Sequence, residues 1–339
     1  MSCTNPQPYL IKKNGGRPQR LQVDWEAGQH LLGRVVYLPC GGCLACRRER
    51  RQELTLLQCC EASLHDDNWF VTLTYDDWKT IQLDGLPPYS LNKKHLSEFN
   101  ESMRKYCQYN GVPYRFFACG EYGDQNERPH YHLTIFGLSP KLLGIKEGIS
   151  QNDRTEYLAR FAKIKNFAES SRDSSGFMYW QSPVISSRWQ YGNHQIYRAN
   201  RETMQYVAGY TVKKLTGDLG KAFRATGRVS EFATQSRPSI GFPWFTKFFE
   251  TLSQPDGDKL VNDYLSIAGV SWRIPRIFKK WYSLLDPFNA PAHLDMLQKI
   301  RELDLPLVPD RQDLKRKADF DLYSAERYKS NRSLHKEVN

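Results

Sequence analysis

The chain has 339 residues, a formal net charge of +11, and 19 Tyr, 17 Phe and 8 Trp. This length allows one elaborated domain or two. A basic, aromatic-rich chain suits a nucleic-acid partner, because cations contact phosphates and rings stack on unpaired bases, although a solvated basic surface explains the composition equally well. No run approaches the ~20 apolar residues of a membrane span, and no signal-peptide pattern opens the chain. We therefore expect no membrane partner, and thiols or metal ligands for the 8 cysteines in a reducing cytoplasm.

A cysteine-rich segment follows a Gly- and Pro-rich start in which residues 34–38 resemble a short strand. Its three cysteines are spaced as in part of a metal knuckle. They are Cys40, Cys43 and Cys46. Structural Zn²⁺ at these cysteines needs a fourth ligand, for which the candidates are Cys59, Cys60 and His65. The alternative is that they are ordinary thiols in a Gly-rich turn.

A basic stretch opens the helix that is expected after the cysteines and that runs to Leu64. Its arginines are Arg47, Arg48, Arg50 and Arg51. They are candidate contacts for DNA phosphates, and a solvated helix face is an equally good interpretation.

The middle of the chain alternates predicted strands and helices. Residues 69–75 are β-branched and aromatic and end in acidic turn residues, which indicates a strand. A helix is expected from Ser90, with apolar residues at core spacing. A strand at 114–121 and a β-branched run at 130–136 are separated by a polar turn, which predicts an antiparallel hairpin. Further helices are expected at 153–168, 200–215, 243–253, 256–268 and 275–285, a strand at 177–180, and a loosely docked tail over the last ~30 residues.

Two histidines two residues apart open the strand predicted at 130–136. Because side chains alternate along a strand, His130 and His132 share one face and can bind a divalent metal together. The hairpin places Glu121 near His130, and Asp76 and Asp77 are reserve carboxylates. The remaining histidines that lack a partner in sequence are expected to be structural or surface groups: His30, His65, His95 and His194.

The helix expected from Asn200, a good N-cap residue, carries two tyrosines and two lysines. Tyr206 and Tyr210 are four residues apart and share a face, opposite the apolar face that packs in the core. Lys213 and Lys214 lie on the tyrosine side, where they can stabilise or protonate oxygens. A tyrosine oxygen can attack a phosphodiester when Mg²⁺ or Mn²⁺ polarises the phosphate and the phenolate is stabilised. Surface tyrosines with wet hydroxyls are the alternative.

The chain resembles the HUH endonucleases, which include rolling-circle replication initiators and relaxases. Three motifs carry this resemblance: His130-Tyr131-His132 for the metal, Tyr210-Thr211-Val212-Lys213 for the nucleophile, and Phe70-Val71-Thr72-Leu73-Thr74-Tyr75 for the first strand. Further stretches resemble the initiators of microviruses, and of the gokushovirus branch of these single-stranded DNA phages in particular. They are residues 39–47, 120–123, 206–210 and 236–241.

The resemblance implies an α+β fold with flanking helices around a central antiparallel sheet, the RRM-like palm of HUH endonucleases. It implies a Mg²⁺ or Mn²⁺ site in which Glu121 completes the histidine pair. One of the two tyrosines would cut the viral strand at the origin, stay linked to the 5′ end and leave a 3′-OH. The two tyrosines could alternate as nucleophiles, and which of them acts first is open.

The implied partners are the single-stranded DNA origin and the host DNA polymerase and helicase, in the cytoplasm of the bacterial host cell. We divide the chain into a Cys-rich basic segment (1–66), an HUH endonuclease core (67–216) and a helical C-terminal extension (217–339). Two rival hypotheses stay open. One is a non-catalytic zinc-containing DNA-binding protein, and the other is a metal-dependent phosphodiesterase that uses activated water.

Overall fold

The computed structural model describes residues 3–13, 17–21, 28–30, 33–76, 85–123, 127–145, 171–172, 178–211, 222–223, 225–253, 264–267, 270–288 and 316. The chain separates into two compact units, Met1–Arg50 with Asp286–Asn339 and Arg51–Leu285. The three-domain division stays a prediction, and the helix predicted at 153–168 lies outside the described residues. No helix in the described part combines the length and the apolarity that crossing a bilayer requires.

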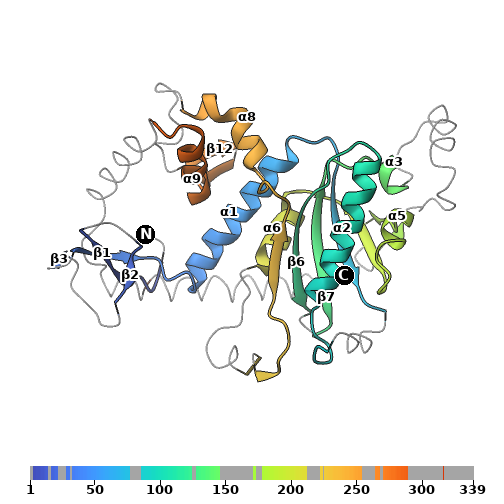
Figure 1. Ribbon diagram of the computed structural model, residues 1–339, viewed down its shortest axis with the longest axis horizontal. Coiled ribbons are helices and arrows are strands. Elements are labelled where there is room, and N and C mark those ends of the chain that lie inside the picture. Colours follow the sequence, from blue (N-terminus) through green and yellow to red (C-terminus); the bar gives the residue numbers. More distant parts are fainter. Residues whose placement is uncertain are drawn as a thin grey trace. The chain divides into compact units, whose positions relative to one another are not determined.

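The smaller unit contains a four-stranded antiparallel sheet close to the N-terminus (Figure 1). Its order is β2 (Gln19–Arg20), β1 (Gln7–Lys12), β4 (Gly33–Leu38) and β3 (Gly28–His30). The sequence predicted the strand that forms β4 and missed the others, because they are short and lie among Gly and Pro residues that obscure a strand pattern. Leu10 and Val35 pair across β1 and β4, and both are buried.

The larger unit is built on a five-stranded antiparallel sheet in the order β10-β5-β7-β6-β11. Its strands are β10 (His194–Arg198), β5 (Asn68–Thr74), β7 (Pro129–Phe136), β6 (Arg115–Tyr122) and β11 (Phe232–Gln235). The predicted α+β fold with a central antiparallel sheet is confirmed, as is the β6-β7 hairpin. Edge strand β11 comes from the segment that was predicted to be helical, because four residues give too short a pattern to recognise.

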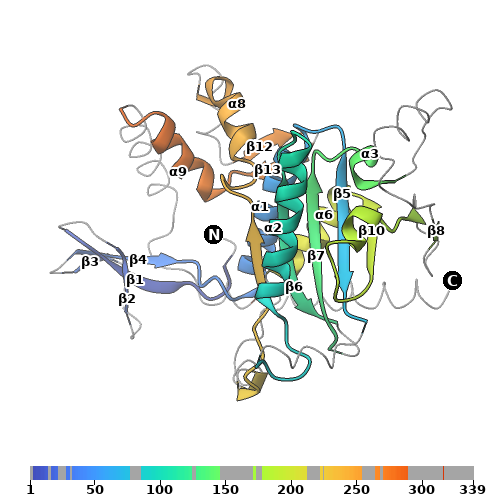
Figure 2. The same cartoon turned by 45° about the vertical axis from the view of Figure 1, so that its right-hand side comes forward.

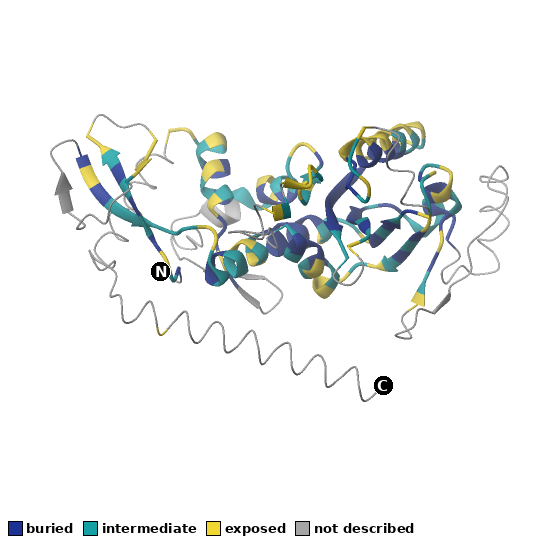
Figure 3. Ribbon diagram, turned by 90° about the horizontal axis from the view of Figure 1, so that it is seen from below, coloured by how far each residue is buried: buried dark blue, intermediate teal, exposed yellow. Residues whose placement is uncertain are grey.

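Helix α2 (Lys93–Tyr109) covers one face of this sheet (Figures 1 and 2). Tyr131, Leu133 and Ile135 of β7 point to this face and form one buried cluster with Leu96 and Phe99 of the helix. Burying a large apolar side chain contributes about 1.5–3 kcal/mol. Figure 3 shows how strongly burial concentrates in these strands. The apolar half of β7 therefore fixes which of its residues face the other way.

A buried ion pair joins helix α1 (Leu44–Ala62) to the opposite face of the sheet. Arg115 Nε donates to Glu61 Oε1 at 2.6 Å, and both side chains are buried. Arg115 also donates to the Pro238 carbonyl at 2.7 Å, and the Gly241 N–H donates to Glu61 Oε2 at 2.7 Å. Gly241 has a φ of +78°, and a Cβ on it would lie 3.2 Å from a backbone oxygen of α1, so this position favours glycine. The stretch at 236–241 therefore encloses the ion pair.

Further described helices are α3 (Pro140–Leu143), α5 (Pro183–Ser186), α8 (Phe242–Ser253) and α9 (Arg276–Leu285), and the short strands are β8 (Ser171–Arg172), β9 (Met178–Tyr179), β12 (Tyr264–Ile267) and β13 (Val270–Arg273). The positions of α8 and α9 confirm the predicted helices there. The helix predicted at 256–268 is wrong over residues 264–267, which pair with β13, since the alternation of apolar and polar residues favours a strand. Helix α2 begins at Lys93 and not at the predicted Ser90, because Asn92 caps it.

The ion pair of Glu61 makes the stability of the fold depend on acid. Burial raises the pKa of its carboxyl, but hydrogen bonds from His65, Arg115 and the Gly241 N–H outweigh burial and lower the pKa from 4.5 to about 2. A carboxyl with a lowered folded-state pKa stabilises the fold above its unfolded pKa, and this contribution is lost as the pH falls through the folded pKa. We expect Glu61→Gln to reduce the free energy of unfolding at neutral pH by about 3 kcal/mol, because Arg115 then lacks its charge partner.

Urea unfolding across the acid range measures this effect. The free energy of unfolding of the unmodified protein should decline from about pH 4.5 towards about pH 2, and Glu61→Gln should flatten that decline. Glu101→Gln is the matched control, since its partner Lys105 lies 2.9 Å away in an exposed pair. Equal behaviour of the two variants would contradict the assignment.

Candidate active site

Strands β6 and β7 place a carboxylate directly opposite the histidine pair. Glu121 is the register partner of His130 in the hairpin. His130 Nε2 lies 2.6 Å and His132 Nε2 lies 3.0 Å from the same oxygen, Glu121 Oε1. The three residues each offer a ligand atom within 4.8 Å of the others. The structure therefore brings together the three side chains that the sequence proposed as metal ligands.

The two imidazoles are oriented through their other ring nitrogens. His130 Nδ1 donates to the Arg128 carbonyl at 2.9 Å, and His132 Nδ1 contacts the Thr72 hydroxyl at 3.0 Å. Partners of this kind fix the ring orientation of a ligating histidine and raise the basicity of its free nitrogen. Both Nε2 atoms therefore converge on Glu121.

Glu121 is an anion with half of its carboxylate unsatisfied. It is 2% exposed, and its Oε2 atom has no hydrogen-bond partner among the described residues. Burial raises the pKa of this carboxyl, but hydrogen bonds from His130 and His132 outweigh burial and hold the pKa below its ordinary value. A buried anionic oxygen without a donor is costly, and a cation would satisfy it.

The spacing of the donor atoms fits a hexacoordinate ion. Ligands about 2.1 Å from an octahedral metal lie roughly 3 Å from their neighbours. The nitrogen-to-oxygen distances of 2.6 and 3.0 Å in this cluster are close to that value. Two imidazoles and one carboxylate suit Mn²⁺ and, with water completing the shell, Mg²⁺.

Helix α6 (Arg201–Tyr210) carries the two tyrosines to the histidine pair. Asn200 caps it with a capping box, which confirms the predicted start of this helix. The Tyr210 ring stacks on His132 with centroids 5.2 Å apart, and the Tyr206 ring meets the same imidazole edge-on at 5.3 Å. The two tyrosine rings are 4.7 Å from each other. Both phenols therefore lie beside one candidate ligand.

The two tyrosines differ in exposure. Tyr206 is 42% exposed, whereas Tyr210 is 6% exposed. The prediction that both turn away from the packed interior is therefore wrong for Tyr210. Helix α6 is covered on two sides, since Met204 faces α1 and the tyrosine side contacts β6 and β7. A helical pattern reveals the apolar face, but it does not reveal a second face that packs on the polar side of a sheet.

A buried glutamine of α1 links the strand and the helix of the site. Thr134 Oγ1 donates to Gln58 Oε1 at 2.7 Å, and Gln58 Nε2 donates to the Met204 carbonyl at 3.1 Å. Sequence reasoning missed both Gln58 and Thr72. Alternation along β5 would have found Thr72, because it is the register partner of His132. Gln58 gives no periodic signal, since it is a polar residue among the apolar positions of α1.

The predicted cations fall in three places. Arg51 lies beside α6, because a Cβ on Gly209 would be 3.5 Å from Arg51 Cδ. Its Nε atom is buried and has no hydrogen-bond partner in the described part of the chain. The other arginines of the basic stretch, Arg47, Arg48 and Arg50, lie in the first turns of α1. The two lysines, Lys213 and Lys214, lie outside the described residues.

The reserve carboxylates and the remaining histidines stay outside the cluster. Asp76 accepts a hydrogen bond from Asn193, as a turn residue does, and Asp77 lies outside the described residues. His95 contacts the Tyr75 hydroxyl at 3.1 Å. His194 is buried, which lowers its pKa to about 4. These two histidines therefore have structural roles.

The cysteine cluster has a different fourth member from the predicted ones. Cys3 lies with three others in one group whose Sγ atoms are within 4.8 Å of each other, the others being Cys40, Cys43 and Cys46. Cys59 instead contacts Met204, His65 contacts Glu61, and Cys60 is not part of the group. No sequence pattern indicated Cys3, because it precedes Cys40 by 37 residues.

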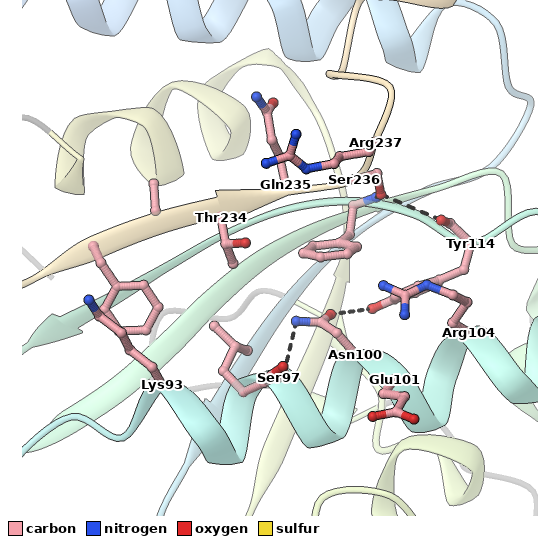
Figure 4. Close-up of a pocket in the computed structure, with 14 residues that line it drawn as sticks. Lys93, Ser97, Asn100, Glu101, Arg104, Tyr114, Thr234, Gln235, Ser236 and Arg237 are labelled. Carbon is pink, nitrogen blue, oxygen red and sulfur yellow. Dashed lines mark hydrogen bonds between the residues drawn. The ribbon is translucent and has the colours of Figure 1, made fainter.

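A cavity of about 600 Å³ between α2 and β11 is separate from the histidine cluster (Figure 4). Its lining includes Lys93, Arg104 and Arg237, and none of the candidate metal ligands or tyrosines. Polar groups in it bond to one another, as when the Tyr114 hydroxyl donates to Asn100 Oδ1 at 2.9 Å. We assign no chemistry to this cavity.

Comparison with known proteins agrees with the class that the fold and cluster suggest. Residues 68–215 match the family model of the replication-associated protein ORF2. The chain is 26% identical over 268 residues to the replication-associated protein ORF2 of Spiroplasma virus 4, which covers 78% of this chain and 73% of that protein. It is 26% identical over 306 residues to the replication-associated protein VP4 of Bdellovibrio phage phiMH2K, covering 85% and 84%.

A third relative is the replication-associated protein ORF4 of Chlamydia phage 1, with 26% identity over 256 residues that cover 74% of this chain and 55% of the relative. No solved structure matches the chain, so its assignment to the HUH fold stays a prediction. The resemblance to microvirus replication initiators is confirmed at the level of the family. The chain is a relative of the replication-associated proteins of these phages.

The bridge made by Gln58 yields a prediction about the anchoring of α6. Gln58→Leu leaves the Thr134 hydroxyl and the Met204 carbonyl without their partner, which should lower the free energy of unfolding by about 1–3 kcal/mol. Amide hydrogen exchange should accelerate in α6 more than in β6. Gln108→Leu, on the exposed side of α2, is the control and should change neither. Slow exchange in α6 of the Gln58 variant would contradict the bridging role.

Proposed function

We propose that this chain initiates rolling-circle replication of a single-stranded DNA phage by nicking the viral strand at the origin with a tyrosine. The observation that carries the proposal is the contact of two tyrosine rings with one imidazole of a His-His-Glu cluster. Core packing alone does not require a buried carboxylate with an unpaired oxygen at that point. The replication-associated relatives support the same role.

In this proposal His130, His132 and Glu121 hold Mg²⁺ or Mn²⁺. When bound, such an ion supplies positive charge that polarises a phosphate oxygen and stabilises the transition state. Three protein ligands leave coordination positions for phosphate oxygens and water. Thr72 and the Arg128 carbonyl keep the two imidazoles in the ligating orientation.

The tyrosine supplies the nucleophile. Its oxygen attacks the phosphorus of the scissile phosphodiester, the P–O3′ bond breaks, and the departing oxygen takes up the proton that the phenol loses. The products are a 5′-phosphotyrosine and a free 3′-OH, so no water is consumed and a second nucleophile can reverse the step. We assign the first attack to Tyr206, because it is 42% exposed and Tyr210 only 6%.

The remaining steps follow from two neighbouring tyrosines. Because the rings of Tyr206 and Tyr210 are 4.7 Å apart, the second phenol can receive the strand end that the first one releases. The free 3′-OH would serve a host polymerase, with a host helicase opening the duplex. Arg51 beside α6 is the cation placed to contact DNA phosphate near the tyrosines, and the remaining arginines of α1 and the two lysines after α6 would extend that contact.

Metal binding by the cluster is the first testable consequence. Glu121→Gln should weaken Mn²⁺ binding by roughly 100-fold or more, and Thr72→Val by about 10–100-fold, because the second change frees only the far side of His132. Isothermal titration calorimetry measures both. Glu101→Gln, at an exposed carboxylate of α2, should bind Mn²⁺ like the unmodified protein. Equal affinity in all of these proteins would rule the cluster out as the metal site.

Covalent nicking is the second consequence. Purified protein with Mn²⁺ should cut one of a set of end-labelled single-stranded fragments that cover the phage genome, and stay attached to the 5′ side on a denaturing gel. Tyr206→Phe should slow adduct formation at least about tenfold, and the Tyr206→Phe, Tyr210→Phe double variant should abolish it. Tyr109→Phe, at a 90% exposed tyrosine of α2, should have no effect.

The same gel separates the rival functions. An adduct that persists in the double variant would show that the tyrosine assignment is wrong. Cleavage without an adduct would indicate a phosphodiesterase that uses water. Binding that survives chelation, without any cleavage, would indicate a non-catalytic DNA-binding protein.

A further inference from the structure

Four cysteines from two distant segments meet in the smaller unit of the chain. Cys3 precedes strand β1, and the other three lie between the end of β4 and the first turn of α1: Cys40, Cys43 and Cys46. Their Sγ atoms all lie within 4.8 Å of one another, and Cys3 and Cys46 are buried. All four are free thiols in the structure.

Strand register explains how Cys3 reaches the others. In the antiparallel pair, Gln7 of β1 lies opposite Leu38 of β4. Carried past the ends of the two strands, this register places Cys3 opposite Gly42, which lies in the turn between Cys40 and Cys43. The backbone therefore delivers the N-terminal cysteine to the knuckle before any metal is considered.

The sulfur spacing is that of ligands around one ion. Zinc binds thiolates at about 2.3 Å, so sulfurs at the corners of a tetrahedral site lie roughly 3.8 Å apart. Cys43 Sγ and Cys3 Sγ are 3.8 Å apart. A disulfide would need about 2.05 Å. Four thiols at this spacing, from both ends of a strand pair, match a tetrahedral site and not two disulfides.

The backbone around the cysteines is shaped as a binding turn. The Cys40 N–H donates to Cys3 Sγ at 3.2 Å, and the Cys43 N–H donates to Cys40 Sγ at 3.3 Å. Donors of this kind stabilise thiolate charge. Gly41 has a φ of +73°, which a residue with a side chain rarely adopts, so the turn depends on glycine. Cys46 lies in the first turn of α1, where the positive end of the helix dipole also favours thiolates.

We infer that Cys3, Cys40, Cys43 and Cys46 bind one structural Zn²⁺ ion. Four protein ligands close the coordination shell, so the ion has no open position for a substrate and serves the fold. It joins the start of β1 to the start of α1 and thereby closes the N-terminal sheet, whose strands are too short to form a large core of their own. This site is independent of the histidine cluster and of the nicking proposal.

Metal analysis of the full-length protein tests the inference. Inductively coupled plasma mass spectrometry should find about one zinc per chain, and Cys3→Ser should lose most of it, because three thiolates bind zinc far more weakly than four. Cys59→Ser is the matched control and should keep its zinc, since Cys59 was a fourth ligand only by sequence proximity. The His130→Asn, His132→Asn double variant should also keep it, which places the zinc away from the histidines.

A second measurement uses the unmodified protein and does not require that the Cys3 variant fold. Iodoacetamide labelling read by mass spectrometry should leave the four cysteines unmodified, and they should become reactive together after a chelator removes zinc. Cys107 and Cys119, which are fully buried in the larger unit, should stay protected. Zinc retained by Cys3→Ser, a protein that is purified without zinc, an iron–sulfur absorption spectrum, or disulfides among these cysteines would each overturn the inference.

Discussion

The pairing of β6 with β7 is the constraint on which the candidate site depends. This register puts Glu121 opposite His130, and a slip of one residue would turn both histidines to the face under α2. Tyr131, Leu133 and Ile135 prevent that slip, because they would lose their burial in the apolar cluster. Three such side chains represent several kcal/mol. The apolar face of β7 therefore sets the position of the polar one.

The polar face of the sheet is covered as well, and a covered polar face must satisfy its groups in pairs. Gln58 satisfies Thr134, and Glu61 satisfies Arg115, so that α1 is joined to the sheet through polar contacts. Glu121 departs from this rule, because one of its oxygens has no hydrogen-bond partner among the described residues. A cation between this carboxylate and the two imidazoles would complete the pairing, which is the physical basis for interpreting the cluster as a metal site.

Local patterns predicted the parts of this site that lie within single elements. Alternation along β7 gave the shared face of the two histidines, the polar turn gave the hairpin with Glu121, and Asn200 gave the start of α6. The missed features arise from contacts between elements. Burial of Tyr210 depends on the sheet that covers α6, and Cys3 joins its cluster only through the register of β1 with β4. One sequence contains no periodic signal for contacts of this kind.

The most direct test of the central claim is to locate the bond between protein and DNA. The adduct that forms with Mn²⁺ and a cleaved single-stranded fragment can be digested with nuclease and protease and sequenced by tandem mass spectrometry. We predict a nucleotide 5′-phosphate on the peptide that contains Tyr206, with a smaller share on Tyr210. A nucleotide on any other residue, or cleaved DNA without a modified peptide, would contradict the proposed function.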